Sequence, residues 1–202
     1  KRLNEQLTLQ ATVGAEYSEI RQTGSSNVTR DFVRPKGFLA LNYKPANDLF
    51  LSAKLERAVG QLRFFDFIAS VDVNQEREDV TNVNLVPPQS WDFTLEAQQS
   101  LGKSGNLTLS LFYEDVEDIV DRIPIEGGGQ APGNIDSASA YGGFFDATLL
   151  SDEFLWKGGR ADLSFGYMTS KVKDPILGNT RKISGDYYKS YMLSLRQDFN
   201  DT

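Results

Sequence analysis

Five carboxylates stand within eight residues of the sequence and form its densest group of side chains that could do chemistry: Glu114, Asp115, Glu117, Asp118 and Asp121. Carboxylate oxygens bind Ca²⁺, and a suitably spaced pair of carboxylates can hydrolyse a glycosidic bond. The spacing does not match an EF-hand loop, and the sequence indicates no cleft around the group. We therefore favour a solvated extension of a strand over a metal site or a catalytic pair.

Two other segments suggest ligand contacts. The glycine-rich run GGGQAPG at 127–133 could hold a phosphate, but it lacks the Lys-Ser/Thr ending and the following helix of a phosphate-binding loop, so we expect an external loop. Gln61 and the segment 63–67, with Arg63 and three phenylalanines, could capture a ligand through cationic and aromatic side chains. The alternative for this segment is a loop that packs on its own aromatic rings.

The composition excludes many kinds of function. The chain has no Cys and no His, which removes disulfides, thiolate and imidazole metal sites, and every catalytic triad that needs histidine. The net charge of -7, with Lys and Arg scattered along the chain, gives no basic face for a phosphate backbone. We expect a protein that is not an enzyme, carries no cofactor or metal, and has no nucleic-acid partner.

The stretch LVPPQSWDFTLEAQQ at 85–99 alternates between apolar and polar residues. Trp91, Phe93, Leu95 and Ala97 fall on one face of a strand, because side chains in a strand alternate with a period of two. This strand is expected over 85–101, and the same alternation predicts strands at 5–21, 33–44, 49–59, 106–123, 136–150, 159–173 and 184–199. The predicted fold is all-β, an antiparallel up-and-down meander of about eight long strands.

The connections alternate in length. Long connections are predicted at 22–32, 61–89, 124–135 and 174–183, with short turns after the other strands, so all the long loops lie at one end of the sheet. Outer-membrane barrels sort their loops in this way. No apolar run is long enough for a membrane helix, but a membrane strand needs only about 9 to 11 residues with every second one apolar.

Soluble architectures offer two alternatives. One is a complete eight-stranded lipocalin-like barrel that binds a ligand, and the other is a β-sandwich carbohydrate-binding module. In both, the apolar face would pack against protein and the polar face would meet water. The orientation of Trp91, Phe93 and Leu95 discriminates between them and a membrane barrel, since a closed dry interior favours a soluble protein and an outward orientation favours lipid.

The segment NVNLVPPQSWDFTLEAQQSLGKSGNLTLSLFYEDVEDIVDRIPI at 82–125 resembles the barrel of TonB-dependent outer-membrane receptors. These often carry Asn-Pro-x-Leu-x-Pro-Glu before a strand with a Glu, then a short turn, a Leu-x-Leu strand that ends in Tyr, and Asp-x-Ile. The matching residues are Asn82, Leu85, Pro87, Ser90, Glu96, Leu107, Leu109, Leu111, Tyr113, Glu117, Asp118 and Ile119. Val83 and Pro88 depart from the pattern. The segments 133–150 and 174–185 add weaker similarity.

The resemblance implies a 22-stranded transmembrane barrel, filled by a plug domain, that takes up a scarce ligand such as siderophore-iron across a Gram-negative outer membrane with energy from TonB. The implied partners are outer-membrane lipid, a small molecule such as a metal chelate or an oligosaccharide, and TonB acting through the plug. We expect residues 1–202 to be part of such a barrel, internal or near its C-terminus, without a plug domain or TonB box. Its open strand edges would allow self-association.

The resemblance also orients the strand over 85–101. Pro87 and Pro88 would be its first residues, where proline is tolerated. Trp91 would then lie at the outer membrane interface with Phe93, Leu95 and Ala97 in lipid, and the residues that face the lumen would be Asp92, Thr94, Glu96 and Gln98.

Overall fold

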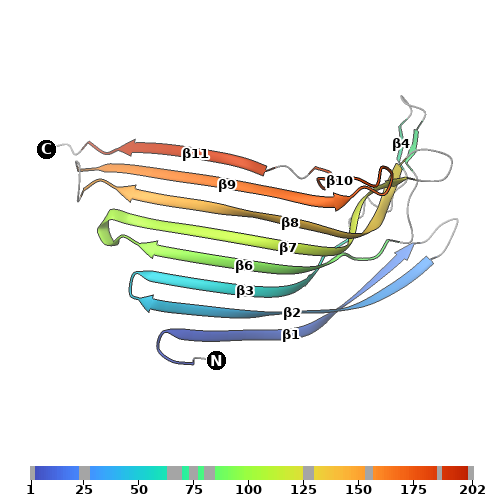
Figure 1. Cartoon of the computed structure of the whole chain (residues 1–202), viewed down its shortest axis with the longest axis horizontal. Coiled ribbons are helices and arrows are strands. Elements are labelled where there is room, and N and C mark those ends of the chain that lie inside the picture. The colour runs from blue at the N-terminus through green and yellow to red at the C-terminus, as the bar shows by residue number, and fades with distance from the viewer. Residues whose placement is uncertain are drawn as a thin grey trace.

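A computed structural model describes residues 3–22, 28–62, 70–72, 77–79, 85–124, 130–152, 157–185 and 188–199. Eight long strands form one antiparallel sheet (Figure 1): β1 (Leu7–Gln22), β2 (Val28–Ala46), β3 (Leu49–Val59), β6 (Gln89–Ser100), β7 (Gly105–Pro124), β8 (Gln130–Leu150), β9 (Gly159–Lys173) and β11 (Tyr188–Gln197). Each long strand pairs with the next along the chain, with β1 at one edge and β11 at the other. The predicted meander of eight long strands is confirmed.

Four short elements accompany the long strands in the described residues. The strands β4 (Ser70–Asp72) and β5 (Arg77–Asp79) form a separate hairpin, and β10 (Thr180–Arg181) pairs with the last residues of β9. The 3-10 turn η2 (Gly102–Ser104) joins β6 to β7. No helix in the described residues is long and apolar enough to cross a membrane.

The predicted alternation of long and short connections holds only in part. The connections from β2 to β3, from β6 to β7 and from β8 to β9 lie at the left end of the sheet in Figure 1, as predicted, but the eight residues between β8 and β9 exceed the five between β1 and β2 and the five between β7 and β8. We call the opposite end, where the long connections from β3 to β6 and from β9 to β11 lie, the outer end. The connections themselves were predicted too long at two places, 22–32 and 124–135, because ladder pairs continue to Gln22↔Val28 and Pro124↔Gln130. The strands predicted at 33–44 and 136–150 therefore begin earlier, at Val28 and Gln130.

Two further strand boundaries were wrong. β6 begins at Gln89 rather than at residue 85, because Pro87 and Pro88 have no N–H to give to a ladder and the residues before Gln89 bind other partners. The last strand spans Tyr188–Gln197 rather than 184–199, and β10, within the connection predicted at 174–183, was not foreseen.

The register of the sheet places the apolar side chains in continuous rows. Leu41 pairs with Ala53, Ala53 with Leu95, and Leu95 with Leu111, and parallel rows lie on either side. We call this surface, built largely from odd-numbered residues, the apolar face. The polar face beneath it carries the even-numbered residues of the same strands, which in β6 include Asp92, Thr94, Glu96 and Gln98.

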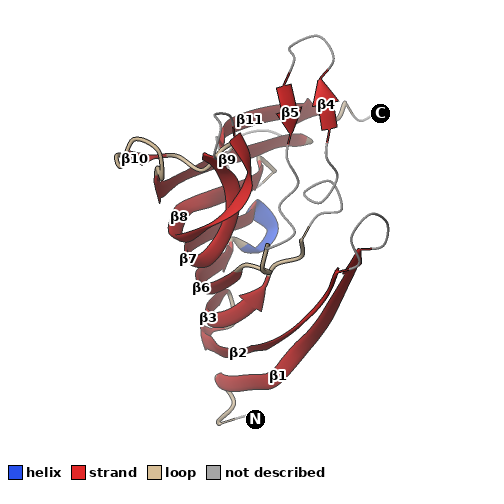
Figure 2. Cartoon of the chain, turned by 90° about the vertical axis from the view of Figure 1, so that its right-hand side faces the viewer, coloured by secondary structure: helices blue, strands red, loops and turns tan. Residues whose placement is uncertain are grey.

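The apolar face is the outer side of a curved sheet. Figure 2 shows the strands stacked in a trough, open on one side. From Trp91 to Glu96 the apolar positions of β6 are the more exposed ones, and Trp91, Phe93 and Leu95 are 46, 42 and 40% exposed. Curvature spreads side chains on the outer side of a sheet and crowds those on the inner side. The expectation that these three residues do not line a closed, dry interior is therefore confirmed.

The alternation of faces is interrupted near the outer end of β7 and β8. Asp118 has φ 57°, and the ladder passes from Glu117↔Ser137 to Ile119↔Ile135 without pairing it. Irregular positions of this kind re-aim the side chains that follow. In β8 the buried positions next to the interruption are the even-numbered Ala138 and Ala140 on one side and odd-numbered residues on the other side, and Ala147, farther along the strand, is buried at an odd-numbered position.

A small hydrophobic core results at this end. Val116, Ile135, Ala138 and Val172 are buried together, with Ile119, Ile123 and Ile183 packed against them. Ile183 belongs to the connection that follows β9, so this core fixes a long loop onto the sheet. The odd-numbered apolar residues that follow Asp118 in β7 thus contribute to a protein core and not to the exposed apolar face.

Substitution of Gly142 tests how closely the side chains and backbone pack on the polar face around it. A Cβ on Gly142 would meet the carbonyl oxygen of Tyr167, the Cα of Met168 and the ring of Phe112. We expect Gly142→Ala to lower the free energy of unfolding by about 1–3 kcal/mol, because neighbouring backbone must shift. Gly14→Ala is the control, since nothing lies within 4 Å of its Cβ position, and it should change stability by about 0.5 kcal/mol or less. Urea titration measures both, and equal effects would contradict the register.

Candidate functional site

Residues 85–88, which carry part of the sequence resemblance, form a strap at the outer end. Leu85 is fully buried, and its carbonyl oxygen accepts a hydrogen bond of 3.0 Å from Nη1 of Arg30 in β2. The carbonyl oxygen of Pro88 accepts one of 2.8 Å from the N–H of Gly60. The strap is therefore attached on one side to β2 and to the end of β3.

Asn134 of β8 holds the other side of the strap. Its Oδ1 accepts the N–H of Val86 at 2.9 Å, and its Nδ2 donates to the carbonyl oxygens of Val86 at 2.9 Å and Asp118 at 2.6 Å. One side chain thus pairs both backbone groups of Val86, as a neighbouring strand would, and also binds the irregular position of β7. In the sequence, Asn134 counted only as part of the segment 133–150 that adds to the resemblance, and its contacts with Val86 and Asp118 were not predicted.

Gln89, the first residue of β6, connects the strap to two arginines. Its Oε1 accepts hydrogen bonds of 3.1 Å from Arg34 and of 3.1 Å from Arg57, and its Nε2 donates to the carbonyl oxygen of Pro35 at 3.1 Å. Its exposed fraction is only 4%. A buried polar group of this kind is stable only when its hydrogen bonds are made.

The five carboxylates of the predicted acidic cluster lie along β7, and the structure gives three of them different partners. Glu117 pairs with Arg57 at 2.6 Å, Asp118 with Arg34 at 3.1 Å, and Asp121 with Arg181 at 2.8 Å. Glu114 and Asp115 lie opposite Asp92 and Trp91 of β6, as the register of the ladder shows. No three Asp or Glu residues in the described part of the chain are arranged to hold a metal ion.

Arg181 fixes the loop that follows β9. Its Nε donates to Asp174 at 2.7 Å and its Nη1 to Asp121 at 2.8 Å, so it joins the loop to β7. Asp174 also accepts the N–H groups of Leu177 and Ile176. These two backbone hydrogen bonds, followed by the guanidinium of Arg181, hold the pKa of Asp174 below its ordinary value of 3.8.

The polar face carries charges in cross-strand rows. Glu56, Asp92 and Glu114 lie directly opposite one another on β3, β6 and β7, and Lys54 pairs with Glu56 at 2.5 Å. Like charges directly opposite one another are unfavourable. An aromatic pair, Phe112 and Phe144, stacks nearby on this face with ring centroids 5.9 Å apart. The polar face therefore offers carboxylates, a cation and aromatic rings to whatever occupies the trough.

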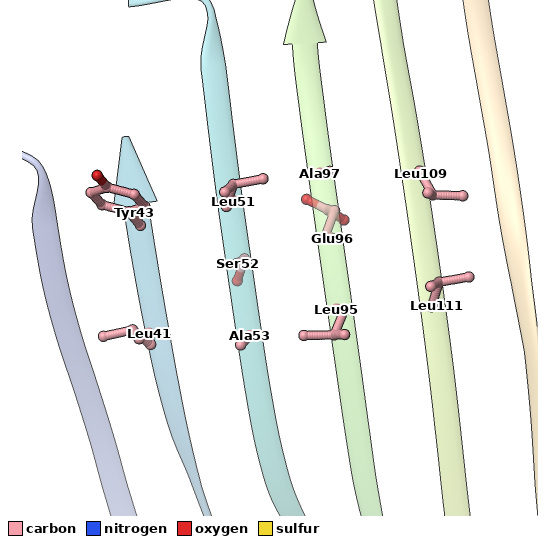
Figure 3. Close-up of a pocket in the computed structure, with 10 residues that line it drawn as sticks. All are labelled: Leu41, Tyr43, Leu51, Ser52, Ala53, Leu95, Glu96, Ala97, Leu109 and Leu111. Atoms are coloured by element: carbon pink, nitrogen blue, oxygen red, sulfur yellow. The ribbon is translucent and has the colours of Figure 1, made fainter. Parts of the chain in front are cut away.

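The apolar face contains a shallow groove of about 390 Å³ (Figure 3). Its floor includes the small residues Ala53 and Ala97, and larger side chains on neighbouring strands flank them: Leu41, Tyr43, Leu51, Leu95, Leu109 and Leu111. The sequence signal for this groove is alanine at two apolar positions that the register makes close neighbours. Ser52 and Glu96 also line the groove, so its surface is mostly but not wholly apolar.

The structure describes only part of the two other segments that the sequence suggested as ligand contacts. Gln61 donates to Glu16 at 2.5 Å, but residues 63–67 lie outside the described residues, so the proposed ligand contact of this segment stays a prediction. Of the glycine-rich run 127–133, residues 127–129 lie outside the described part, and the remaining residues are in β8. That run is therefore not wholly an external loop.

No protein-family model matches the sequence, and no curated protein matches it. Solved structures do match. "Copper transporter OprC" aligns with a TM-score of 0.65 at 18% identity, covering 84% of this chain and 26% of that one. The alcaligin outer-membrane receptor FauA from Bordetella pertussis aligns with a TM-score of 0.60 at 16% identity, covering 96% of this chain and 32% of that one.

The chain thus shares its fold with a section of each of these two proteins. One is named a copper transporter and the other an outer-membrane receptor, and the likeness to both agrees, at the level of the fold, with the resemblance noted at 82–125. The chain spans about a quarter to a third of the length of these proteins. Their names describe a transporter and a receptor, and neither describes an enzyme.

Removing the Asn134 side chain tests the strap. Asn134→Ala leaves the N–H and C=O of Val86 without their partner, which costs about 1–3 kcal/mol. We expect faster hydrogen exchange at the Val86 amide, followed by mass spectrometry or NMR. Ser137→Ala, at an exposed position of the same strand, is the control and should leave the rate unchanged. Equal exchange rates in the two variants would show that Asn134 does not hold the strap.

The loop that follows β9 should be insensitive to pH until strongly acidic conditions. Because folding lowers the pKa of Asp174, its stabilising effect is complete above 3.8 and is lost as the pH falls through the lower value in the folded protein. A dye on Leu177→Cys reports loop mobility by fluorescence anisotropy. We expect constant anisotropy from pH 7 to about 4 and a decrease below that.

The control for this titration is Asp174→Asn in the same dye-labelled protein. It removes the titrating carboxylate and should abolish the acid transition. A transition centred above pH 4, or one that persists in this variant, would contradict the assignment to Asp174.

Proposed function

We propose that this chain is part of the membrane-spanning barrel wall of a TonB-dependent receptor in a Gram-negative outer membrane, which takes up a small ligand. The observation that supports the proposal best is the uninterrupted apolar face. Leu55, Phe93, Tyr113 and Tyr141 continue from strand to strand in one row, and their exposed positions would cost free energy in water. Hydrocarbon is the environment in which such a surface is stable.

Aromatic and cationic side chains border this face toward the outer end. The guanidinium of Arg57 lies 5.3 Å from the ring of Trp91, and the ammonium of Lys171 lies 5.8 Å from the ring of Tyr141. Aromatic girdles mark the membrane interfaces of outer-membrane barrels, and long cations extend from the interface toward water. The membrane would accordingly cover β6 from about Trp91 to Gln99, and the strap, the small core and the carboxylate pairs would lie outside it.

The open edges support a larger barrel. β1 and β11 end the sheet, and strand edges in lipid must be paired because unpaired backbone groups have no water to bind. We infer that further strands close the wall into a barrel of about 22 strands with a plugged lumen. Residues 1–202 are then one part of the barrel domain, and TonB acts through a plug that this part does not provide.

The polar face would line the lumen and contact the plug or the ligand. Among ligand classes we propose a metal chelate, such as siderophore-iron, with an oligosaccharide as the alternative. The names of the two structural neighbours, which refer to copper and to alcaligin, favour the metal-containing class. The soluble alternatives fit less well, since a closed lipocalin-like barrel or a sandwich would cover the apolar face with protein.

Uptake by cells tests the function. Disrupting the gene in its Gram-negative host should abolish uptake of one radiolabelled probe among a ferric siderophore, a copper chelate and an oligosaccharide. Disrupting TonB should abolish the same uptake, and the intact gene should restore it. Unchanged uptake of all three probes would overturn the proposed ligand classes, and uptake that persists without TonB would overturn the energy source.

Arginine scanning of adjacent positions tests the membrane span. Leu95 lies on the apolar face and Thr94 on the polar face of the same strand. An arginine in the middle of the lipid face costs about 2–4 kcal/mol, so Leu95→Arg should lower the free energy of folding into lipid vesicles by that amount. Thr94→Arg, the control, should cost about 1 kcal/mol or less. A larger loss of folding free energy for Thr94→Arg than for Leu95→Arg would contradict the proposal, because it would place lipid against the polar face.

A further inference from the structure

The outer halves of β1 and β2 form a ribbon that separates from the rest of the sheet. We define it as residues 14–22 and 28–36. The ladder between β1 and β2 continues to Gln22↔Val28, whereas the ladder between β2 and β3 stops at Gly37↔Arg57. In the described strands the ribbon is thus paired only with itself, and Figures 1 and 2 show it diverging from the stack of β3 to β9.

Two glycines lie where the ribbon leaves the sheet. Gly14 pairs with Lys36, and Gly37 pairs with the adjacent Val13, so the glycines occupy neighbouring rungs of the ladder. A Cβ on Gly37 would meet the carbonyl oxygen of Thr12, so only glycine fits there. Glycine within a strand weakens it and commonly marks a bend. The two positions together give the ribbon a hinge.

Side chains alone hold the ribbon to the rest of the described protein. Arg34 donates to Asp118 of β7 at 3.1 Å and to Gln89 at 3.1 Å. In a flat sheet β2 and β7 are separated by three strand spacings of about 4.8 Å each, so this contact requires the ribbon to lean across the outer ends of β3 and β6. Arg30, which binds the carbonyl oxygen of Leu85, then lies over the buried strap.

We propose that the ribbon is a flap that opens and closes at the outer end of the trough, with its hinge at Gly14 and Gly37 and its latch at Arg34. The structure describes the closed position, in which Arg34 bridges Gln89 and Asp118. The ion pair is partly exposed, with 23 and 37% of the two side chains accessible, and ion pairs of this kind are weak compared with a backbone ladder. Opening breaks these contacts and the hydrogen bond between Arg30 and the strap. It also breaks the hydrogen bonds that Gln89 donates to the carbonyl oxygen of Pro35 and that Gln61 donates to Glu16.

Distance measurements between two spin labels test the latch. The chain has no cysteine, so the exposed residues Val33 of the ribbon and Ser137 of β8 can be replaced with cysteine and labelled specifically. We expect one narrow distance distribution in the otherwise unchanged protein in lipid vesicles, and an added longer component in Arg34→Gln. Arg21→Gln is the matched control and should keep the narrow distribution, because the ion pair of Arg21 in the described part of the chain is with Glu19 of the ribbon itself.

Identical distributions in all three proteins would overturn the latch. Hydrogen exchange on the unmodified protein tests the hinge without any variant. Ladder amides of residues 28–36 should exchange about tenfold faster or more than those of residues 38–43 in the same strand, because a two-stranded ribbon released from its other contacts is only marginally stable and frays. Uniform protection along β2 would overturn the flap. Neither result depends on the identity of the ligand, so failure here leaves the proposed uptake function standing.

Discussion

The register of neighbouring strands is the constraint on which the rest of the structure depends. A slip of one residue at any ladder would move a whole set of side chains to the other face. The pairing Leu41↔Ala53↔Leu95↔Leu111 is repeated in the rows beside it, and the register between β2 and β3 shifts only at the turn end, between Tyr43 and Ala46. One face is apolar across its width for this reason, and the other can carry Glu56, Asp92 and Glu114 without placing a charge on the apolar face.

The outer end follows a different physical rule. Past Asp118 the buried positions of β7 and β8 change from even to odd, and apolar residues such as Ile135 enter a small core. Backbone polar groups there form hydrogen bonds with side chains from distant parts of the chain. Asn134, for example, binds both the N–H and the carbonyl oxygen of Val86. A surface suited to lipid thus gives way to one that packs against its own loops, which is consistent with a barrel whose strands extend beyond the membrane.

Much of the fold was predictable because a period of two is a local signal. The strand around Trp91, Phe93 and Leu95 and the side on which these residues lie followed from their spacing alone. The strand ends were harder, since β2 and β8 continue through Thr29 and Ala131 only because a partner strand runs beside them. The roles of Gln89 and Asn134 depend on partners 16 to 55 residues away, which no local pattern reveals.

Trp91 offers the most direct test of the central claim that the apolar face meets lipid. The chain has two tryptophans, so Trp156→Phe leaves Trp91 as the single fluorophore. The protein would be reconstituted in vesicles whose acyl chains carry bromine at successive depths, because bromine quenches tryptophan only on contact. We predict strong quenching by bromine close to the headgroups and weaker quenching at the bilayer centre. Fluorescence unaffected by bromine at any depth would contradict the assignment of this face to lipid.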